Sequence, residues 1–173
     1  LTMRSFYTGN FLGLLNVFGV GCGIVSLIMI LMHGSAYLAR RTEDNLQLLA
    51  RRIHAVTTIV LVILFTVLGI LLFNANGYIL KYSPNHAIDD VLGNLVVSYK
   101  GAWVDSYNTY HWKYYGPIGM YVGAIISLWG NAFSWYTTCF WGSVMCVCGV
   151  IATGGLSLFP FLMPSSTNPD ESI

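Results

Sequence analysis

Four long apolar stretches, separated by polar segments, dominate the pattern of residues along the chain. A helix needs roughly 20 mainly apolar residues to cross a bilayer, and the third stretch, which contains Pro117 and several glycines, is marginal by that measure. The stretches show no strand-like alternation, and open strands in lipid would leave their backbone groups unpaired. The pattern therefore predicts an all-α, polytopic transmembrane helix bundle with four spanning helices. These cover about residues 11–38, 53–80, 114–133 and 135–159.

Two of the predicted helices carry small and polar residues along one side. Membrane helices associate through small residues that let their backbones approach, so we expect these stripes to face other helices. The bulky opposite side of the last helix, with Trp141 and Met145, is expected to face lipid or a larger partner. The first stripe holds Asn16, Gly19, Gly23, Ser26 and His33, and the last holds Cys139, Ser143, Cys146, Val150, Thr153 and Ser157. G-x-x-x-G matches begin at Gly9, Gly19 and Gly119, although 18 glycines make such matches common by chance.

The polar segments between the helices predict how the bundle is oriented. Residues 39–52 form a short predicted loop with four arginines, and this density of basic residues favours the cytoplasmic side. Residues 81–113 then form an extracytoplasmic loop that is rich in aromatic residues. Such a cluster is typical of side chains that anchor at the headgroups. The alternative is stacking on a quinone ring, which makes Trp103 a candidate cofactor contact.

Composition supports a membrane protein and excludes several other classes. Only 9% of the residues are charged and the mean hydropathy is +0.65, whereas soluble domains average roughly 25% charged residues. A net charge of +1 provides no basic surface for nucleic acid. The four cysteines, including the C-x-C pair Cys146 and Cys148, are interpreted as packing residues. Because the chain starts at Leu1 without a signal-like segment and ends in polar sequence, we expect a piece of a longer protein.

Two histidines are the candidate chemical groups of the predicted spans. An ionisable residue within a span is a functional hypothesis by default, and for His33 we weigh a hydrogen-bonded packing role, a proton relay and metal ligation. His54 follows two arginines at a helix start, which indicates a neutral histidine at the membrane interface. The four predicted spans contain no Asp or Glu, so this stretch offers no complete proton path. The chain also lacks nucleotide-binding, dithiol and zinc-protease motifs.

Several short stretches resemble, in order and spacing, subunit II of the cytochrome bd quinol oxidase family. They are Thr-Gly-Asn-Phe-Leu-Gly-Leu-Leu-Asn at residues 8–16, His-Gly-Ser-Ala-Tyr-Leu-Ala-Arg-Arg-Thr-Glu at 33–43, Gly-Tyr at 77–78, Gly-Ala-Trp at 101–103 and Phe-Pro-Phe-Leu-Met-Pro-Ser-Ser-Thr at 159–167. One departure is Val17, where the family commonly has proline, so a kink there is in doubt. By this resemblance the chain covers much of the C-terminal half of the subunit.

The resemblance implies a multi-pass protein of the bacterial inner membrane, in a complex that oxidises quinol and reduces oxygen to water through haems b and d. In the family the haem ligands and the quinol-oxidising loop belong to subunit I. The resemblance therefore implies no catalytic residue and no metal ligand here, and this chain alone is not expected to be catalytic. Subunit II stabilises its partner and contributes part of a proton or oxygen route. His33, Arg40 and Glu43 would serve local structure at the cytoplasmic face, and residues 159–167 would end the last helix.

Two other functions fit the same features. Glycine-rich helices with an intramembrane histidine also suit a permease for small solutes. A non-catalytic scaffold that only holds a partner is the second alternative, and it partly coincides with the role of a haem-free subunit.

Overall fold

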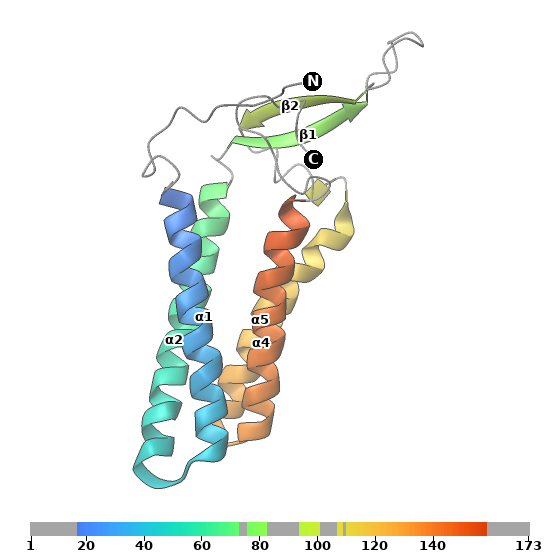
Figure 1. The fold of residues 1–173 in the computed structure, drawn as a ribbon. Coiled ribbons are helices and arrows are strands. Elements are labelled where there is room, and N and C mark those ends of the chain that lie inside the picture. The colour runs from blue at the N-terminus through green and yellow to red at the C-terminus, as the bar shows by residue number, and fades with distance from the viewer. Residues whose placement is uncertain (1–16, 73–75, 83–93, 101–106, 109, 159–173) are drawn as a thin grey trace, which may run out of the picture.

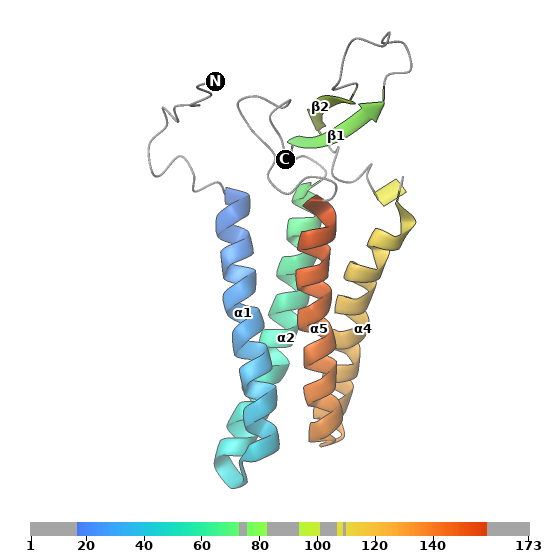
Figure 2. The ribbon, with the colours of Figure 1, turned by 45° about the vertical axis from the view of Figure 1, so that its right-hand side comes forward.

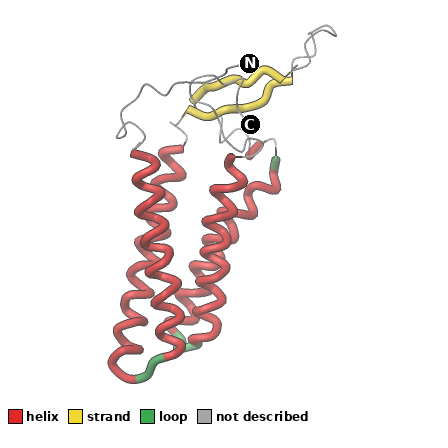
Figure 3. Tube along the Cα trace, viewed as in Figure 1, coloured by secondary structure: helices red, strands yellow, loops and turns green. Residues whose placement is uncertain are grey.

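Four long helices form two antiparallel helical hairpins that lie side by side (Figures 1 and 2). The computed structural model describes residues 17–72, 76–82, 94–100, 107–108 and 110–158. The first hairpin joins α1 (Val17–Arg41) to α2 (Asp44–Leu72), and the second joins α4 (Tyr115–Ala132) to α5 (Tyr136–Leu158). Figure 3 shows that strands occur only outside the helical bundle, among the described residues. The prediction of an all-α membrane bundle is therefore confirmed.

Three of the four helices are long and apolar enough to cross a membrane, namely α1, α2 and α5. The fourth, α4, has 18 residues, or about 27 Å at 1.5 Å per residue. It begins with Tyr115, Gly116 and Pro117, where the predicted third span was marginal. The prediction of four spans is thus one more than length and composition support.

The second helix begins nine residues earlier and ends eight residues earlier than the sequence pattern predicted. It runs over Asp44–Leu72 instead of residues 53–80, so most of the predicted loop at 39–52 is helical. Only Thr42 and Glu43 separate α1 from α2. The physical reason is that Gln, Leu and Arg are good helix formers, so the helix continues through polar sequence after the apolar pattern ends. Hydropathy reports the extent of apolar sequence and not the end of a helix.

A two-stranded antiparallel hairpin replaces the predicted end of the second span. β1 (Asn76–Tyr82) pairs with β2 (Asn94–Lys100) in a register that places Asn76 opposite Lys100 and Tyr82 opposite Asn94. Both strands contain β-branched or aromatic residues, which favour strands over helices. The hairpin lies at the end of the bundle where α1 begins and α2 and α5 end (Figure 1).

The core of the bundle lies between the two helical hairpins. Its buried members are Val25, Met32, Leu61, Met120, Ala124 and Cys146, which come from all four long helices. The predicted stripe on α5 lies largely within this region, because Cys139, Ser143 and Cys146 are buried while Trp141 and Met145 are exposed. The stripe on α1 behaves differently, since a Cβ at Gly19 or Gly23 would meet nothing within 4 Å. The expectation that the stripe faces another helix is therefore wrong at Gly19 and Gly23 within the described residues, where α1 packs on α2 through Gly21 instead.

Candidate functional site

A glycine seam brings the backbones of α4 and α5 into direct contact. A Cβ at Gly130 would lie 2.5 Å from the backbone nitrogen of Cys139, and one at Gly142 would lie 2.5 Å from that of Ser127. A Cβ at Gly123 would likewise clash with the backbone of Cys146, and a Cβ at Gly149 would clash with the backbone of Met120. The spacing along each helix is seven residues, which keeps one face toward an antiparallel partner. Only glycine allows this approach, and it places the polar groups of α4 and α5 beside one another.

His54 lies at the centre of a buried polar cluster that joins four helices. Its side chain, on α2, is 0% exposed. Nδ1 lies 3.1 Å from the carbonyl oxygen of Met32 on α1, and Nε2 lies 2.9 Å from the hydroxyl of Ser127 on α4. That hydroxyl also lies 2.9 Å from the carbonyl oxygen of Cys139 on α5. Helix packing therefore encloses the ring completely, and its position at the membrane interface remains a prediction.

His33 makes a second contact between the hairpins. Its Nδ1 lies 2.9 Å from the Ser143 hydroxyl on α5, and its ring packs on Phe140 with centroids 5.2 Å apart. The hydrogen-bonded packing role considered for His33 thus has a specific partner. A role for His33 as cofactor contact remains a prediction, and Trp103, the other candidate, lies outside the described residues.

Arg51 and Asn131 form a reciprocal contact between α2 and α4 near the turns of the two helical hairpins. The Arg51 guanidinium donates to the Asn131 carbonyl oxygen at 2.6 Å, and the Asn131 amide donates to the Arg51 carbonyl oxygen at 3.1 Å. The guanidinium also lies over the Tyr136 ring at 5.8 Å. Buried Asn131 Oδ1 has no hydrogen-bond partner among the described residues. Ser127 and Asn131 were not predicted from the sequence, although both are polar residues inside an apolar stretch.

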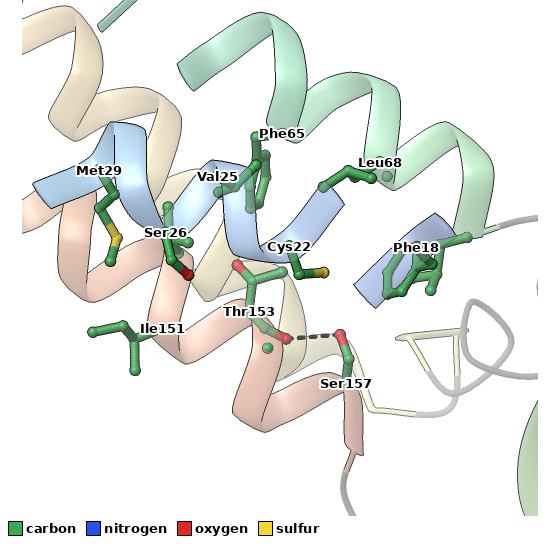
Figure 4. Close-up of a pocket in the computed structure, with 14 residues that line it drawn as sticks. Phe18, Cys22, Val25, Ser26, Met29, Phe65, Leu68, Ile151, Thr153 and Ser157 are labelled. Carbon is green, nitrogen blue, oxygen red and sulfur yellow. Dashed lines mark hydrogen bonds between the residues drawn. The ribbon is translucent and has the colours of Figure 1, made fainter. Parts of the chain in front are cut away.

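An apolar cavity of about 490 Å³ lies at the opposite end of the bundle, between α1, α2 and α5 (Figure 4). Phe18, Met29, Phe65 and Leu68 are among its walls. Its polar members are small, namely Cys22, Ser26, Thr153 and Ser157, and the Ser157 hydroxyl donates to the Thr153 carbonyl oxygen at 2.7 Å. The described lining carries no charged side chain. The cavity suits an apolar group and not a charged solute.

A buried lysine lies just before α4, outside the spanning segments. Lys113, in the 3₁₀ helix η2 (His111–Tyr114), is 0% exposed, and burial lowers the pKa of its ammonium. The ammonium lies 6.0 Å from the Tyr107 ring centroid and 5.4 Å from that of Tyr110. Tyr107 also shares a hydrogen bond of 2.8 Å with Ser157 at the cavity. Of the aromatic cluster expected at the headgroups, Tyr107 is instead buried, whereas Tyr110, Trp112, Tyr114 and Tyr115 are exposed.

The histidines of the four long helices are engaged in hydrogen bonds with protein groups. Among the described residues, no group of three or more His, Cys, Asp or Glu side chains is placed to hold a metal ion. Both nitrogens of His54 lie against protein atoms. His33 is bonded to Ser143 and lies outside the lining of the cavity. The polar cluster around His54 joins the helices through hydrogen-bond donors and acceptors.

Comparison with known proteins gives one family. The family model described as "Cytochrome bd terminal oxidase subunit II" matches residues 1–173. A "Probable cytochrome oxidase subunit 2" of Haemophilus influenzae is 34% identical over 171 residues, which are 96% of this chain and 44% of that protein. The "Cytochrome bd-I ubiquinol oxidase subunit 2" of Escherichia coli K12 is 32% identical over 173 residues, which are 99% of this chain and 46% of that protein. The chain therefore spans about half the length of the curated relatives that it matches.

Proposed function

The chain belongs to the cytochrome bd terminal oxidase subunit II family, and from this premise we propose that it forms part of the haem-free membrane partner of subunit I. The family belongs to a haem-containing terminal oxidase complex, which is an oxidoreductase, and the apolar helices make the chain a membrane protein. In our proposal haem b and haem d are ligated by subunit I. The whole complex oxidises quinol and reduces oxygen to water in the bacterial inner membrane.

The observation that carries this proposal is the use of the buried polar side chains. His54, Ser127, Arg51 and Asn131 bind one another or the backbone of a neighbouring helix. Each of these contacts joins two helices. This is what a supporting subunit requires, because polar contacts and close backbone approach stabilise helix association in lipid.

The permease alternative receives less support from the described residues. Transporter sites are typically formed where helices break near the membrane midplane. Here α1, α2 and α5 are continuous, and Pro117 lies in the first turn of α4, where proline is tolerated. The uncharged cavity also offers no group that would bind an ionic solute.

The proposed orientation places the turns of both helical hairpins at the cytoplasmic side. Arg40 and Arg41 end α1, and Arg51 and Arg52 lie in the second and third turns of α2, so all four lie near one end of the bundle. Basic residues near helix ends favour that side. The β-hairpin would then lie on the extracytoplasmic side. Cysteines introduced at Glu43 and Lys81 of the full-length protein should label from opposite sides of the membrane.

Purification tests the proposed function. The full-length protein should co-purify with a haem-bearing membrane subunit, and His33→Ala should leave the absorption spectrum of all haems unchanged. His111→Ala, outside the spanning helices, is the matched control. Purification as a stable single component that binds a transported solute would contradict the proposal. Loss of one haem's absorption in His33→Ala alone would contradict the assignment of all ligands to the partner.

A further inference from the structure

We propose that His54 is a reversible proton-binding site inside the bundle, and that the Ser127 hydroxyl accommodates both of its charge states by turning. This inference concerns side chains within the described bundle and does not depend on the proposed function. It follows from the donors and acceptors that surround the imidazole.

The Nδ1 side of the ring has one possible hydrogen-bonding role. Nδ1 faces the carbonyl oxygen of Met32 at 3.1 Å. Because a carbonyl oxygen only accepts, Nδ1 must carry a hydrogen to form this bond. The neutral ring is therefore the Nδ1–H tautomer, and its Nε2 is free to accept or to take up a proton.

The Nε2 side permits two arrangements, because the Ser127 hydroxyl has one hydrogen and two neighbours that can accept it. The oxygen lies 2.9 Å from Nε2 and 2.9 Å from the carbonyl oxygen of Cys139. With neutral His54, Ser127 donates to Nε2. With protonated His54, Nε2–H donates to Ser127, which turns its hydrogen to the Cys139 carbonyl. Neither state leaves the imidazole with a buried donor that lacks an acceptor, and neither requires a heavy atom to move.

The neighbours of His54 that can carry positive charge, His33 and Arg51, oppose a permanently protonated ring. His33 on α1 is close enough to interact with His54 electrostatically, and Arg51 lies one turn away on α2. Cys139 on α5 has its sulfur 3.8 Å from the Ser127 oxygen, and α4 contributes only the uncharged Ser127 and Asn131. The carboxylates among the described residues are Glu43 and Asp44, which are exposed at the α1–α2 turn. No carboxylate of the described part therefore holds a proton on His54 permanently, and hydrogen bonds alone stabilise the cation.

A route for the proton leads from the end of the bundle where the helical turns lie. Asn131 is one turn of α4 beyond Ser127 in that direction. Its amide orientation is fixed, because Nδ2 donates to the Arg51 carbonyl oxygen, and this leaves Oδ1 as a buried acceptor with no donor among the described residues. Side chains four residues apart on a helix are neighbours, so this acceptor lies beside Ser127 on the side of the helical turns. Toward the other end of the bundle, the Thr58 hydroxyl lies 3.5 Å from Nε2, but it donates to the His54 carbonyl oxygen at 2.7 Å. The core residues farther along, Leu61 and Met120, are apolar, so we place uptake and release at the same end.

Nitrogen NMR of the full-length protein in lipid, with labelled histidine, tests the proposal. His54→Asn assigns the signals by difference. We expect the Nδ1–H tautomer at about pH 8 and the doubly protonated ring at about pH 5. Ser127→Ala should lower the proton affinity of His54 about tenfold, because the charged donor loses its acceptor. Thr66→Val is the matched control, since Thr66 also joins α2 to α4, through Tyr121, but lies far from His54 along α2; it should leave the affinity unchanged.

Three outcomes would overturn the proposal. The first is a neutral ring protonated on Nε2, and the second is a single protonation state from about pH 8 to about pH 5 in the folded protein. The third is an unchanged proton affinity in a folded Ser127→Ala variant. The first two are read from the unsubstituted protein, so they decide the matter even where a variant fails to fold.

Discussion

The two helical hairpins of this bundle are held together by different means. In the α4–α5 hairpin, glycines bring the two backbones into contact, so that a Cβ at Gly142 would lie 2.5 Å from the Ser127 nitrogen. Between α1 and α2, by contrast, a Cβ at Gly21 would meet the side chain of Leu68, at 2.7 Å. A backbone contact cannot yield when an atom is added, whereas a contact between flexible side chains can. The difference teaches that the α4–α5 hairpin is the more sensitive half of the bundle.

The hairpins also differ in the burial of their charged side chains and in the packing around their glycines. The α4–α5 hairpin begins beside buried Lys113, whereas the charged residues at the α1–α2 turn, such as Arg41 and Asp44, are exposed. Gly19 and Gly23 of α1 have open space around them. Glycine in a helix interior without such a contact costs about 1 kcal/mol relative to alanine, so glycine alone does not mark an interface.

The largest expected effect comes from adding one methyl group to the seam. Gly142→Ala should destabilise the full-length protein by about 3 kcal/mol, because overpacking against a backbone cannot be relieved by a rotamer change. Gly154→Ala, on the same helix with nothing within 4 Å, is the matched control and should be neutral or stabilising. Thermal unfolding in lipid nanodiscs measures both. Equal effects of the two substitutions would show that backbone contact does not distinguish the α4–α5 hairpin.

The sequence predicted this seam only in part. The G-x-x-x-G match that begins at Gly119 predicted one position of it: Gly123 packs closely, whereas a Cβ at Gly119 would lie 3.9 Å from the Gly149 Cα, an ordinary contact. The spacing that the structure uses is seven residues, through Gly123 and Gly130 on α4. A search for glycines at heptad spacing would have found it. The antiparallel pairing with α5 could not be predicted, because one sequence does not fix the relative shift of two helices.

The helical bundle and its family were predictable, and the site was predictable only as single residues. Apolar sequence length determines membrane helices strongly, since lipid leaves the backbone few alternatives. His33 and His54 were selected because ionisable groups in apolar stretches are costly. Their partners Ser143 and Ser127 lie 110 and 73 residues away, so only the packing of the helices reveals them. The β-hairpin was missed because its residues 76–80 continued an apolar pattern that was interpreted as helix.

A smaller effect should follow from the buried charge at the start of the α4–α5 hairpin. Burial lowers the pKa of Lys113 below 10.5, so the unfolded chain binds more protons between that lowered pKa and 10.5. The unfolding free energy should therefore rise with pH through this window. Lys113→Met removes the titrating group while keeping most of the apolar volume, and should flatten this rise. Measuring the unfolding free energy as a function of pH tests this prediction, and Lys81→Met, in β1, is the control. A slope that persists in Lys113→Met would assign the pH dependence to other groups.

The smallest effect concerns the turns, where the two hairpins again differ. Ser134, after α4, has φ of 61°, and Asp44, after α1, has φ of 56°. Both lie in the left-handed region, but aspartate tolerates it better than serine, and Asp44 also lies at the start of α2, where a negative charge is favourable. Ser134→Gly should therefore stabilise the full-length protein by about 0.5 kcal/mol, whereas Asp44→Gly should give no gain. Thermal unfolding in nanodiscs measures the stability change of each variant. A gain in Asp44→Gly without one in Ser134→Gly would mean that the strain is larger at the turn of the α1–α2 hairpin.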